Sequence, residues 1–115
     1  MRRLYGHPSV LEPLAAEPHV VRSGVSAAAD YRADIVASDF LEAYVPEARI
    51  AALVSQYGLD PDAERSNIIL RIVDEALWPF APKEEVAPRP VVAIDLLEAD
   101  DERSRRAGAE MARQL

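Results

Sequence analysis

Residues 46–73, PEARIAALVSQYGLDPDAERSNIILRIV, decide the fold. Proline suits the first turn of a helix, so Pro46 favours a helix that begins there. Apolar residues then recur every third or fourth position, as one helical face requires, at Ile50, Leu53, Val54 and Tyr57. Gly58 stands where a left-handed C-cap ends a helix, and Leu59 follows in the position of the usual apolar contact. This half of the stretch predicts a helix over residues 46–57.

The other half, residues 67–73, predicts a strand with apolar side chains on both faces. Ile68, Leu70 and Ile72 share one face, while Arg71 lies between apolar neighbours on the other. Such a strand is typical of a sheet covered on both sides. Since 115 residues leave no room for two sizeable cores, we expect one core. Its predicted members are Ile50, Leu53, Val54, Ile68, Leu70, Ile72 and Trp78.

The flanking sequence predicts shorter elements. On the N-terminal side we expect a helix interrupted by Pro13, two strands and a short segment N-capped by Ser26, at residues 8–16, 19–22, 40–45 and 27–31. The run 34–40 fits either a strand or a loop. On the C-terminal side we expect an irregular proline loop at 79–90, a strand at 91–94 and a helix from Asp100 or Asp101 to about Gln114.

Short strands alternating with helices, without repeated strand–helix–strand units, indicate the α+β class. We therefore expect one α+β domain over residues 1–115, with a small mixed β-sheet packed with about three helices.

Composition excludes several classes of protein. The chain has 13 basic and 20 acidic side chains and a net charge of −7, so we expect no DNA binding by this segment. It has no cysteine, no apolar run long enough to cross a membrane and no signal-peptide pattern, which predicts a cytoplasmic protein. Twelve arginines against one lysine, with twenty alanines, suggest a GC-rich genome such as an actinobacterial one.

Residues 95–102 contain a dense group of carboxylates. Metal-dependent nucleases gather such groups at strand ends, where oxygen ligands hold Mg²⁺. The alternative function is therefore a small carboxylate-dependent metal enzyme that uses Asp95, Glu98 and Asp100. An acidic start to the last helix explains the same residues without chemistry. The sequence also lacks paired histidines, a nucleophile elbow and a glycine-rich phosphate loop, so we predict a non-enzyme without a cofactor.

The C-terminal segment is the predicted protein-binding surface. Its apolar stripe, formed by Ala107, Met111 and Leu115, is narrow, so the helix buries little of its surface and its charged residues project around the stripe. Arginine is favoured at interfaces because its planar fork makes paired bonds to carboxylates. The predicted contact residues are Asp95, Glu98, Arg103, Arg105, Arg106 and Arg113. The alternative is a solvated helix that only covers the sheet.

Several short segments, in this order, resemble the C-terminal portion of actinobacterial antitoxin-like regulators related to the abortive-infection AbiEi family. They are residues 21–28 (VRSGVSAA), 42–45 (EAYV), 67–71 (NIILR), 78–80 (WPF), 87–88 (AP), 91–98 (VVAIDLLE) and 103–108 (RSRRAG). The resemblance implies an antitoxin and transcriptional regulator of a type IV toxin–antitoxin operon, whose toxin is a nucleotidyltransferase. It implies a non-enzymatic interaction domain that neutralises its toxin by direct binding.

The chain departs from that family at its start. Members usually begin with a winged helix-turn-helix that binds operator DNA, but only eighteen residues precede the strand-like segment at His19. We therefore expect that the chain is the C-terminal part of a longer protein, or that a separate protein binds the DNA. A structural or ligand-sensing domain without a toxin partner is a third interpretation.

Overall fold

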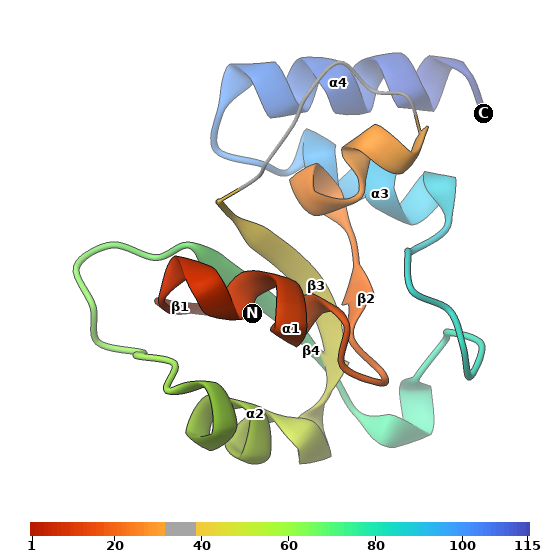
Figure 1. The fold of residues 1–115 in the computed structure, drawn as a ribbon. Coiled ribbons are helices and arrows are strands. Elements are labelled where there is room, and N and C mark those ends of the chain that lie inside the picture. The colour runs from red at the N-terminus through yellow and green to blue at the C-terminus, as the bar shows by residue number, and fades with distance from the viewer. Residues whose placement is uncertain (32–38) are drawn as a thin grey trace.

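The computed structural model describes residues 1–31 and 39–115, which form a four-stranded mixed sheet with helices on both faces (Figure 1). The strand order is β1-β4-β3-β2, in which β3 and β4 are parallel and both outer pairs are antiparallel. The strands are β1 (Arg2–Leu4), β2 (Val21–Arg22), β3 (Leu41–Pro46) and β4 (Ile68–Val73). This arrangement confirms the predicted α+β class.

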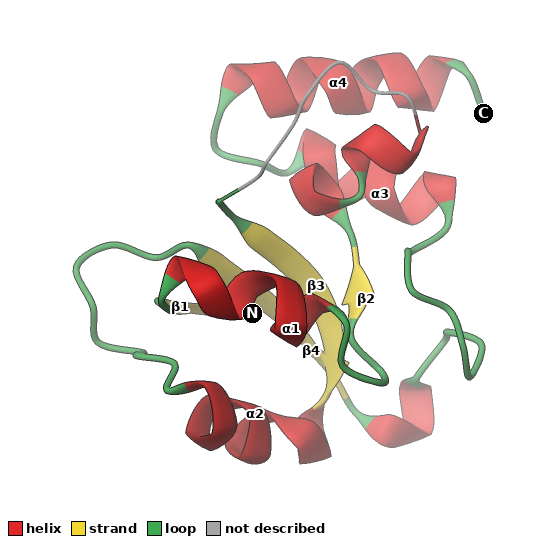
Figure 2. Ribbon diagram, in the orientation of Figure 1, coloured by secondary structure: helices red, strands yellow, loops and turns green. Residues whose placement is uncertain are grey.

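Four α-helices and five short 3-10 turns complete the described chain (Figure 2). The α-helices are α1 (Leu11–Ala15), α2 (Ile50–Tyr57), α3 (Arg89–Leu97) and α4 (Glu102–Arg113). The turns are η1 (Pro8–Val10), η2 (Gly24–Ser26), η3 (Ala28–Tyr31), η4 (Glu47–Arg49) and η5 (Glu75–Leu77). In Figure 1, α3 and α4 lie together on one side of the sheet, away from α1 and α2.

The residue ranges of β3, α2 and β4 match the predicted elements closely, and the structure adds that β3 and β4 are parallel. Pro46 ends β3, η4 follows it directly, and α2 continues to Tyr57. Gly58 has φ 61° and its N–H bonds to the carbonyl of Val54, so it is the left-handed C-cap that the sequence predicts. A connection of this length is what two parallel strands need, because no tight turn can join them.

The prediction of a strand at residues 91–94 is wrong, because these residues lie inside α3. Their two adjacent valines favour a strand locally, but Pro90 suits the first turn of a helix. Val92, Ala93 and Leu96 are buried on one side of that helix. Tertiary burial along a helical face therefore outweighs the local strand preference.

The predicted Ser26 cap is wrong, whereas the predicted helix around Pro13 is present. Ser26 does not cap a helix: its hydroxyl accepts the amide N–H of Glu42 at 2.7 Å and so ties η2 to β3. Pro13 is tolerated within α1 because it falls in the first turn, where its missing N–H costs no hydrogen bond. Of the ambiguous run 34–40, residues 34–38 lie outside the described residues.

The expectation of a single core is wrong, since the sheet has an apolar cluster on each face. One cluster joins β-strand residues such as Leu70 to α1 and to Leu53 of α2. The second joins α3, α4 and the segment around Phe80, and Trp78 packs against this second cluster rather than the first. The other predicted core residues, Ile50, Leu53, Val54, Ile68, Leu70 and Ile72, do belong together.

The last two helices form a tightly packed pair. A Cβ added to Gly108 would come within 2.8 Å of the Ala93 carbonyl oxygen, so glycine permits this close approach. Asp101 caps α4 by accepting the Ser104 amide at 2.8 Å, as predicted. Of the predicted stripe, Met111 is buried and Ala107 packs against the same cluster, whereas Leu115 is exposed. Ser104 and Gly108 are the other buried residues of α4.

Candidate functional site between the sheet and the C-terminal helices

The face of the sheet toward α3 bears polar side chains from its two central strands. Side chains alternate along a strand, so Ala43 and Leu70 face the first apolar cluster while Glu42, Tyr44 and Arg71 face the opposite way. Tyr44 and Arg71 are register partners on adjacent strands. The arrangement places an acid, a phenol and a guanidinium together beneath α3.

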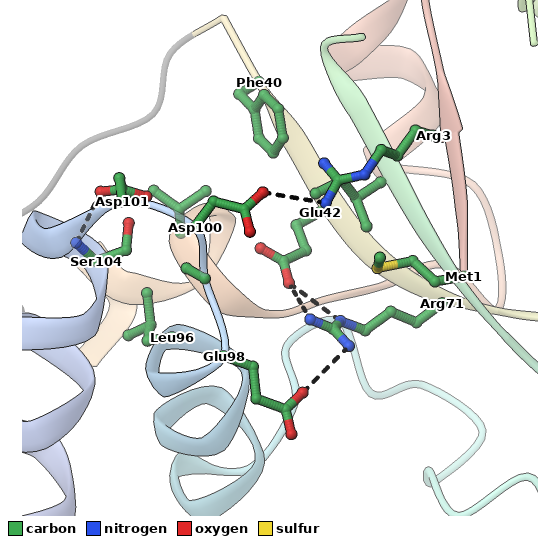
Figure 3. Close-up of a pocket in the computed structure, with 13 residues that line it drawn as sticks. Met1, Arg3, Phe40, Glu42, Arg71, Leu96, Glu98, Asp100, Asp101 and Ser104 are labelled. Atoms are coloured by element: carbon green, nitrogen blue, oxygen red, sulfur yellow. Dashed lines mark hydrogen bonds and ion pairs between the residues drawn. The ribbon is translucent and has the colours of Figure 1, made fainter.

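Glu42 and Arg71 form a largely buried ion pair (Figure 3). The Nε and Nη2 atoms of Arg71 donate to Oε2 of Glu42 at 3.1 and 2.9 Å. Burial raises the pKa of Glu42 above its ordinary value of 4.5, and the hydrogen bonds and charge of Arg71 oppose that rise. A Cβ on Gly24, whose φ is 52°, would lie 2.1 Å from Oε1 of Glu42. Only glycine leaves room there for the carboxylate.

Asp95 of α3 completes the polar cluster. It is 3% exposed, and its Oδ2 accepts the hydroxyl groups of Ser23 at 2.6 Å and Tyr44 at 2.8 Å. Nη1 of Arg71 lies 3.6 Å from its other oxygen. Burial, followed by the bond to Asp95, raises the pKa of Tyr44, so its hydroxyl stays protonated and donates. We call Ser23, Glu42, Tyr44, Arg71 and Asp95 the polar cluster.

A pocket of about 440 Å³ opens beside the polar cluster, between the sheet and the turn that joins α3 to α4 (Figure 3). Arg3 and Asp100 form an ion pair at 3.3 Å in its wall, and Glu98 lies 4.0 Å from Arg71. Apolar side chains line the rest, including Phe40 and Leu96. The charged side chains of the wall thus have partners in the same chain: Arg3, Glu42, Arg71, Glu98 and Asp100 face opposite charges, and Asp101 accepts the Ser104 amide.

The structure separates the three carboxylates of the metal-enzyme alternative. Asp95 is buried and already accepts two hydroxyl groups, Glu98 lies at the pocket, and Asp100 pairs with Arg3. Among residues 1–31 and 39–115, no three His, Asp or Glu side chains converge as metal ligands. The described donor set therefore does not fit the metal site that the carboxylate cluster suggested.

The arginines predicted to bind a partner have different surroundings. Nη1 of Arg105 donates to the carbonyl oxygens of Ala99 and Asp100, at 2.9 and 2.6 Å, and so fastens the turn between α3 and α4. Arg106 pairs with Glu102 one helical turn away, and Arg113 pairs with Glu110. Arg103 is exposed. All four arginines therefore lie on the surface, and Arg105 in addition holds the backbone of the turn.

Sequence reasoning missed four members of the polar cluster: Ser23, Glu42, Tyr44 and Arg71. Two of them carried a signal, because Glu42 and Arg71 are charged residues inside otherwise apolar strands. A charge in such a place needs a buried partner. The identity of that partner depends on tertiary packing.

Residues 4–115 match the protein family described as transcriptional regulator, AbiEi antitoxin, type IV TA system. Because the match covers almost the whole chain, the chain belongs to this family. No curated protein and no solved structure matches it. In the described part of the chain, no helix has the length and apolar character needed to cross a membrane. The family confirms the resemblance and supports an antitoxin and regulator role.

Proposed function

We propose that residues 1–115 form a non-enzymatic protein-binding domain that neutralises a toxin by direct contact. The observation that carries the proposal is the pairing of charged groups at the pocket. Arg71 engages Glu42 and Asp95, and Arg3 engages Asp100. Groups paired in this way support a fold, whereas general acid–base chemistry needs a group that is available to exchange a proton with a substrate.

The contact surface in this proposal is the exposed part of the C-terminal segment. Glu98, Arg103, Arg106 and Arg113 present charge to solvent there. Asp95 supports the surface from behind, because it is buried in the polar cluster. Arg105 is exposed as well, and its bonds to backbone carbonyls hold the turn that precedes α4. The net charge of −7 disfavours DNA as the partner, and the three arginines favour an acidic patch on a protein partner.

The family resemblance extends the proposal to a nucleotidyltransferase toxin encoded beside this chain, with both proteins in the cytoplasm. A fluorescence anisotropy titration with promoter DNA should show no binding tighter than the non-specific range, about 10⁻⁴ to 10⁻⁶ M at physiological salt. Sequence-selective nanomolar binding by residues 1–115 would contradict this part.

The direct-contact proposal is tested by combining purified chain with the neighbouring toxin. We expect a complex that Arg103→Glu with Arg106→Glu weakens by about tenfold or more, because reversing two interface charges opposes association. Arg65→Glu is the matched control, since Arg65 is exposed in the loop between α2 and β4. Relief of toxin-induced growth arrest without any complex would show that neutralisation proceeds without direct contact.

A further inference from the structure

The carboxylates around Arg71 outnumber the guanidinium that they share. Its Nε and Nη2 atoms bond to Glu42, whereas its Nη1 atom lies 3.6 Å from Asp95 and 4.0 Å from Glu98, beyond hydrogen-bond distance. The side chains of Glu42 and Asp95 are both more than nine-tenths buried. The hydroxyl groups that bond to Asp95 carry no net charge. Because buried charges need partners of opposite sign, this part of the described chain has a surplus of buried negative charge.

The wall of the 440 Å³ pocket has the same imbalance (Figure 3). Its charged side chains are the guanidinium groups of Arg3 and Arg71 and the carboxylates of Glu42, Glu98, Asp100 and Asp101. The wall thus has four carboxylates against two guanidinium groups, an excess of two negative charges. A cavity in which one sign of charge predominates concentrates ions of the opposite sign.

The ion pairs at the mouth of the pocket are weak enough to exchange partners. In the pair between Arg3 and Asp100, the aspartate side chain is 89% exposed. The side chain of Glu98 is 63% exposed and stands at the distance limit of an ion pair with Arg71. Water screens pairs of this kind, so they contribute little to the fold. Glu98 and Asp100 can therefore bind a ligand while Glu42 stays paired with Arg71.

The rest of the wall is apolar. Val25, Phe40 and Leu96 contribute to it, and the aromatic ring of Phe40 can attract a cation over its face. Aliphatic side chains cover the methylene groups of a ligand in the same way as they cover one another. A volume of about 440 Å³ lies within the range of small-molecule sites. The pocket therefore fits a ligand that has positively charged ends and an apolar middle.

A bare metal ion does not fit this wall. Mg²⁺ and Ca²⁺ need several oxygen ligands that converge on one point. Among residues 1–31 and 39–115, no three acidic or histidine side chains converge in this way. Glu42 lies on β3, whereas Asp100 and Asp101 lie in the turn between α3 and α4. Carboxylates that are spread over a wall favour a ligand whose positive charges are also separated.

We propose that this pocket binds a small aliphatic dication, either a diamine or a guanidino-amine. One charged end lies beside Glu98, the other lies beside Asp100, and the methylene chain packs against Phe40 and Leu96. Two positive charges balance the excess of two carboxylates, and ammonium and guanidinium groups donate charge-assisted hydrogen bonds to them. The site does not depend on the proposed toxin contact, and its tests use the chain without toxin.

The first experiment is an NMR titration of the whole chain with agmatine, a guanidino-amine, at low salt. We expect saturable shifts of the amide signals of residues 96–104, with a Kd below about 1 mM. Butylguanidine has the same stem and a single charge, so it should bind at least about fivefold more weakly. Absence of saturation up to about 10 mM agmatine overturns the proposal. Equal binding of the two compounds also overturns it, because the pocket would then suit a singly charged group such as an arginine side chain of a partner.

The second experiment removes one exposed carboxylate of the wall at a time. Glu98→Gln and Asp100→Asn keep the shape of the side chain, and each should raise the Kd of agmatine at least about fivefold. Glu110→Gln is the matched control, because Glu110 is an exposed carboxylate on α4 that does not line the pocket. It changes the net charge equally and should leave the Kd within about twofold. With all variants folded by circular dichroism, an unchanged Kd in both pocket variants, or an equal rise in the control, overturns the proposal.

The third experiment separates an organic cation from a metal. Mg²⁺ should displace agmatine no more than sodium chloride of equal ionic strength does, because general screening is then its only effect. Displacement that is specific to Mg²⁺ would assign the pocket to a metal ion and overturn the proposal.

Discussion

The two faces of the sheet are stabilised by different kinds of interaction. Toward α1 and α2, strands β3 and β4 present aliphatic side chains such as Val45, Ile68 and Leu70, all fully buried. Toward α3, the same strands present Glu42, Tyr44 and Arg71. The first face is stabilised by removing apolar area from water, which does not depend on direction. The second is stabilised only if each polar group finds its partner.

The comparison shows which face of the sheet tolerates substitutions and which face requires particular residues. An apolar side chain can be replaced by another of similar volume at moderate cost in stability. Members of the polar cluster cannot be replaced in this way, because in the described chain every buried side-chain nitrogen and oxygen has a hydrogen-bond partner. Removing one partner leaves the others desolvated and unpaired. The face toward α3 therefore defines one arrangement of α3 over the sheet.

The largest expected effect is the loss of Arg71. Arg71→Met keeps a long apolar stem but leaves Glu42 and Asp95 without their cation. Removing one partner of a buried pair costs about 3–5 kcal/mol. Urea unfolding at neutral pH measures this cost. The double variant Glu42→Gln with Arg71→Met should recover part of it, because the buried charge of Glu42 is then absent. A loss below about 1 kcal/mol in Arg71→Met would contradict a buried-pair role.

The apolar face is tested by truncation of Leu70. It is fully buried at the middle of β4, and Leu53 of α2 is buried in the same cluster. Leu70→Ala and Leu53→Ala should each lower the free energy of unfolding by about 2–5 kcal/mol, the usual range for buried leucine. Chemical denaturation measures both. Changes below about 0.5 kcal/mol in both variants would contradict the predicted packing.

A smaller effect is expected from the cap of α4. Asp101→Ala removes the acceptor of the Ser104 amide and should cost about 0.5–2 kcal/mol. Bonds to the Ser104 amide and side chain lower the pKa of Asp101 below its ordinary value of 3.8. Its contribution is therefore present above that value and is lost as the pH falls through the folded-state pKa. Asp101→Asn, which retains an acceptor, is the control: its loss in thermal unfolding should be smaller.

The smallest effect has the opposite pH dependence. Burial raises the pKa of Glu42, so between 4.5 and that raised value the folded chain binds more protons than the unfolded chain. Stability then decreases as the pH rises through this window. Glu42→Gln, which is neutral at every pH, should lack this contribution. Denaturation of both proteins across the window tests the sign, and a wild-type stability that rises there relative to Glu42→Gln would contradict it.

The sequence predicted those elements whose ends are marked by a capping residue or a proline. The β3–α2–β4 unit follows from Pro46, Gly58 and the spacing of the apolar residues between them. The start of α4 follows from Asp101. These signals act within a few residues of the chain, so tertiary contacts do not have to be known.

Helix α3 shows why other elements could not be predicted in this way. Its valines favour a strand locally. The segment is nevertheless a helix, because Val92 and Leu96 are then buried together against elements that are distant in the sequence. The second apolar cluster was missed for the same reason, since its members come from both ends of the chain. Trp78 was assigned to the wrong cluster because its aromatic character indicates burial but not a side of the sheet.

By itself, the sequence determined the α+β class, the ranges of β3, α2 and β4 and the family resemblance, because these depend on local spacing and on short motifs. Only the tertiary structure decided that Ser23, Glu42, Tyr44, Arg71 and Asp95 meet, and that Gly24 and Gly108 leave room for close contacts. Ser23 and Asp95 are 72 residues apart in the chain. Hydrogen bonds act over about 3 Å, so only the packing of α3 over the sheet determines which polar side chains become partners.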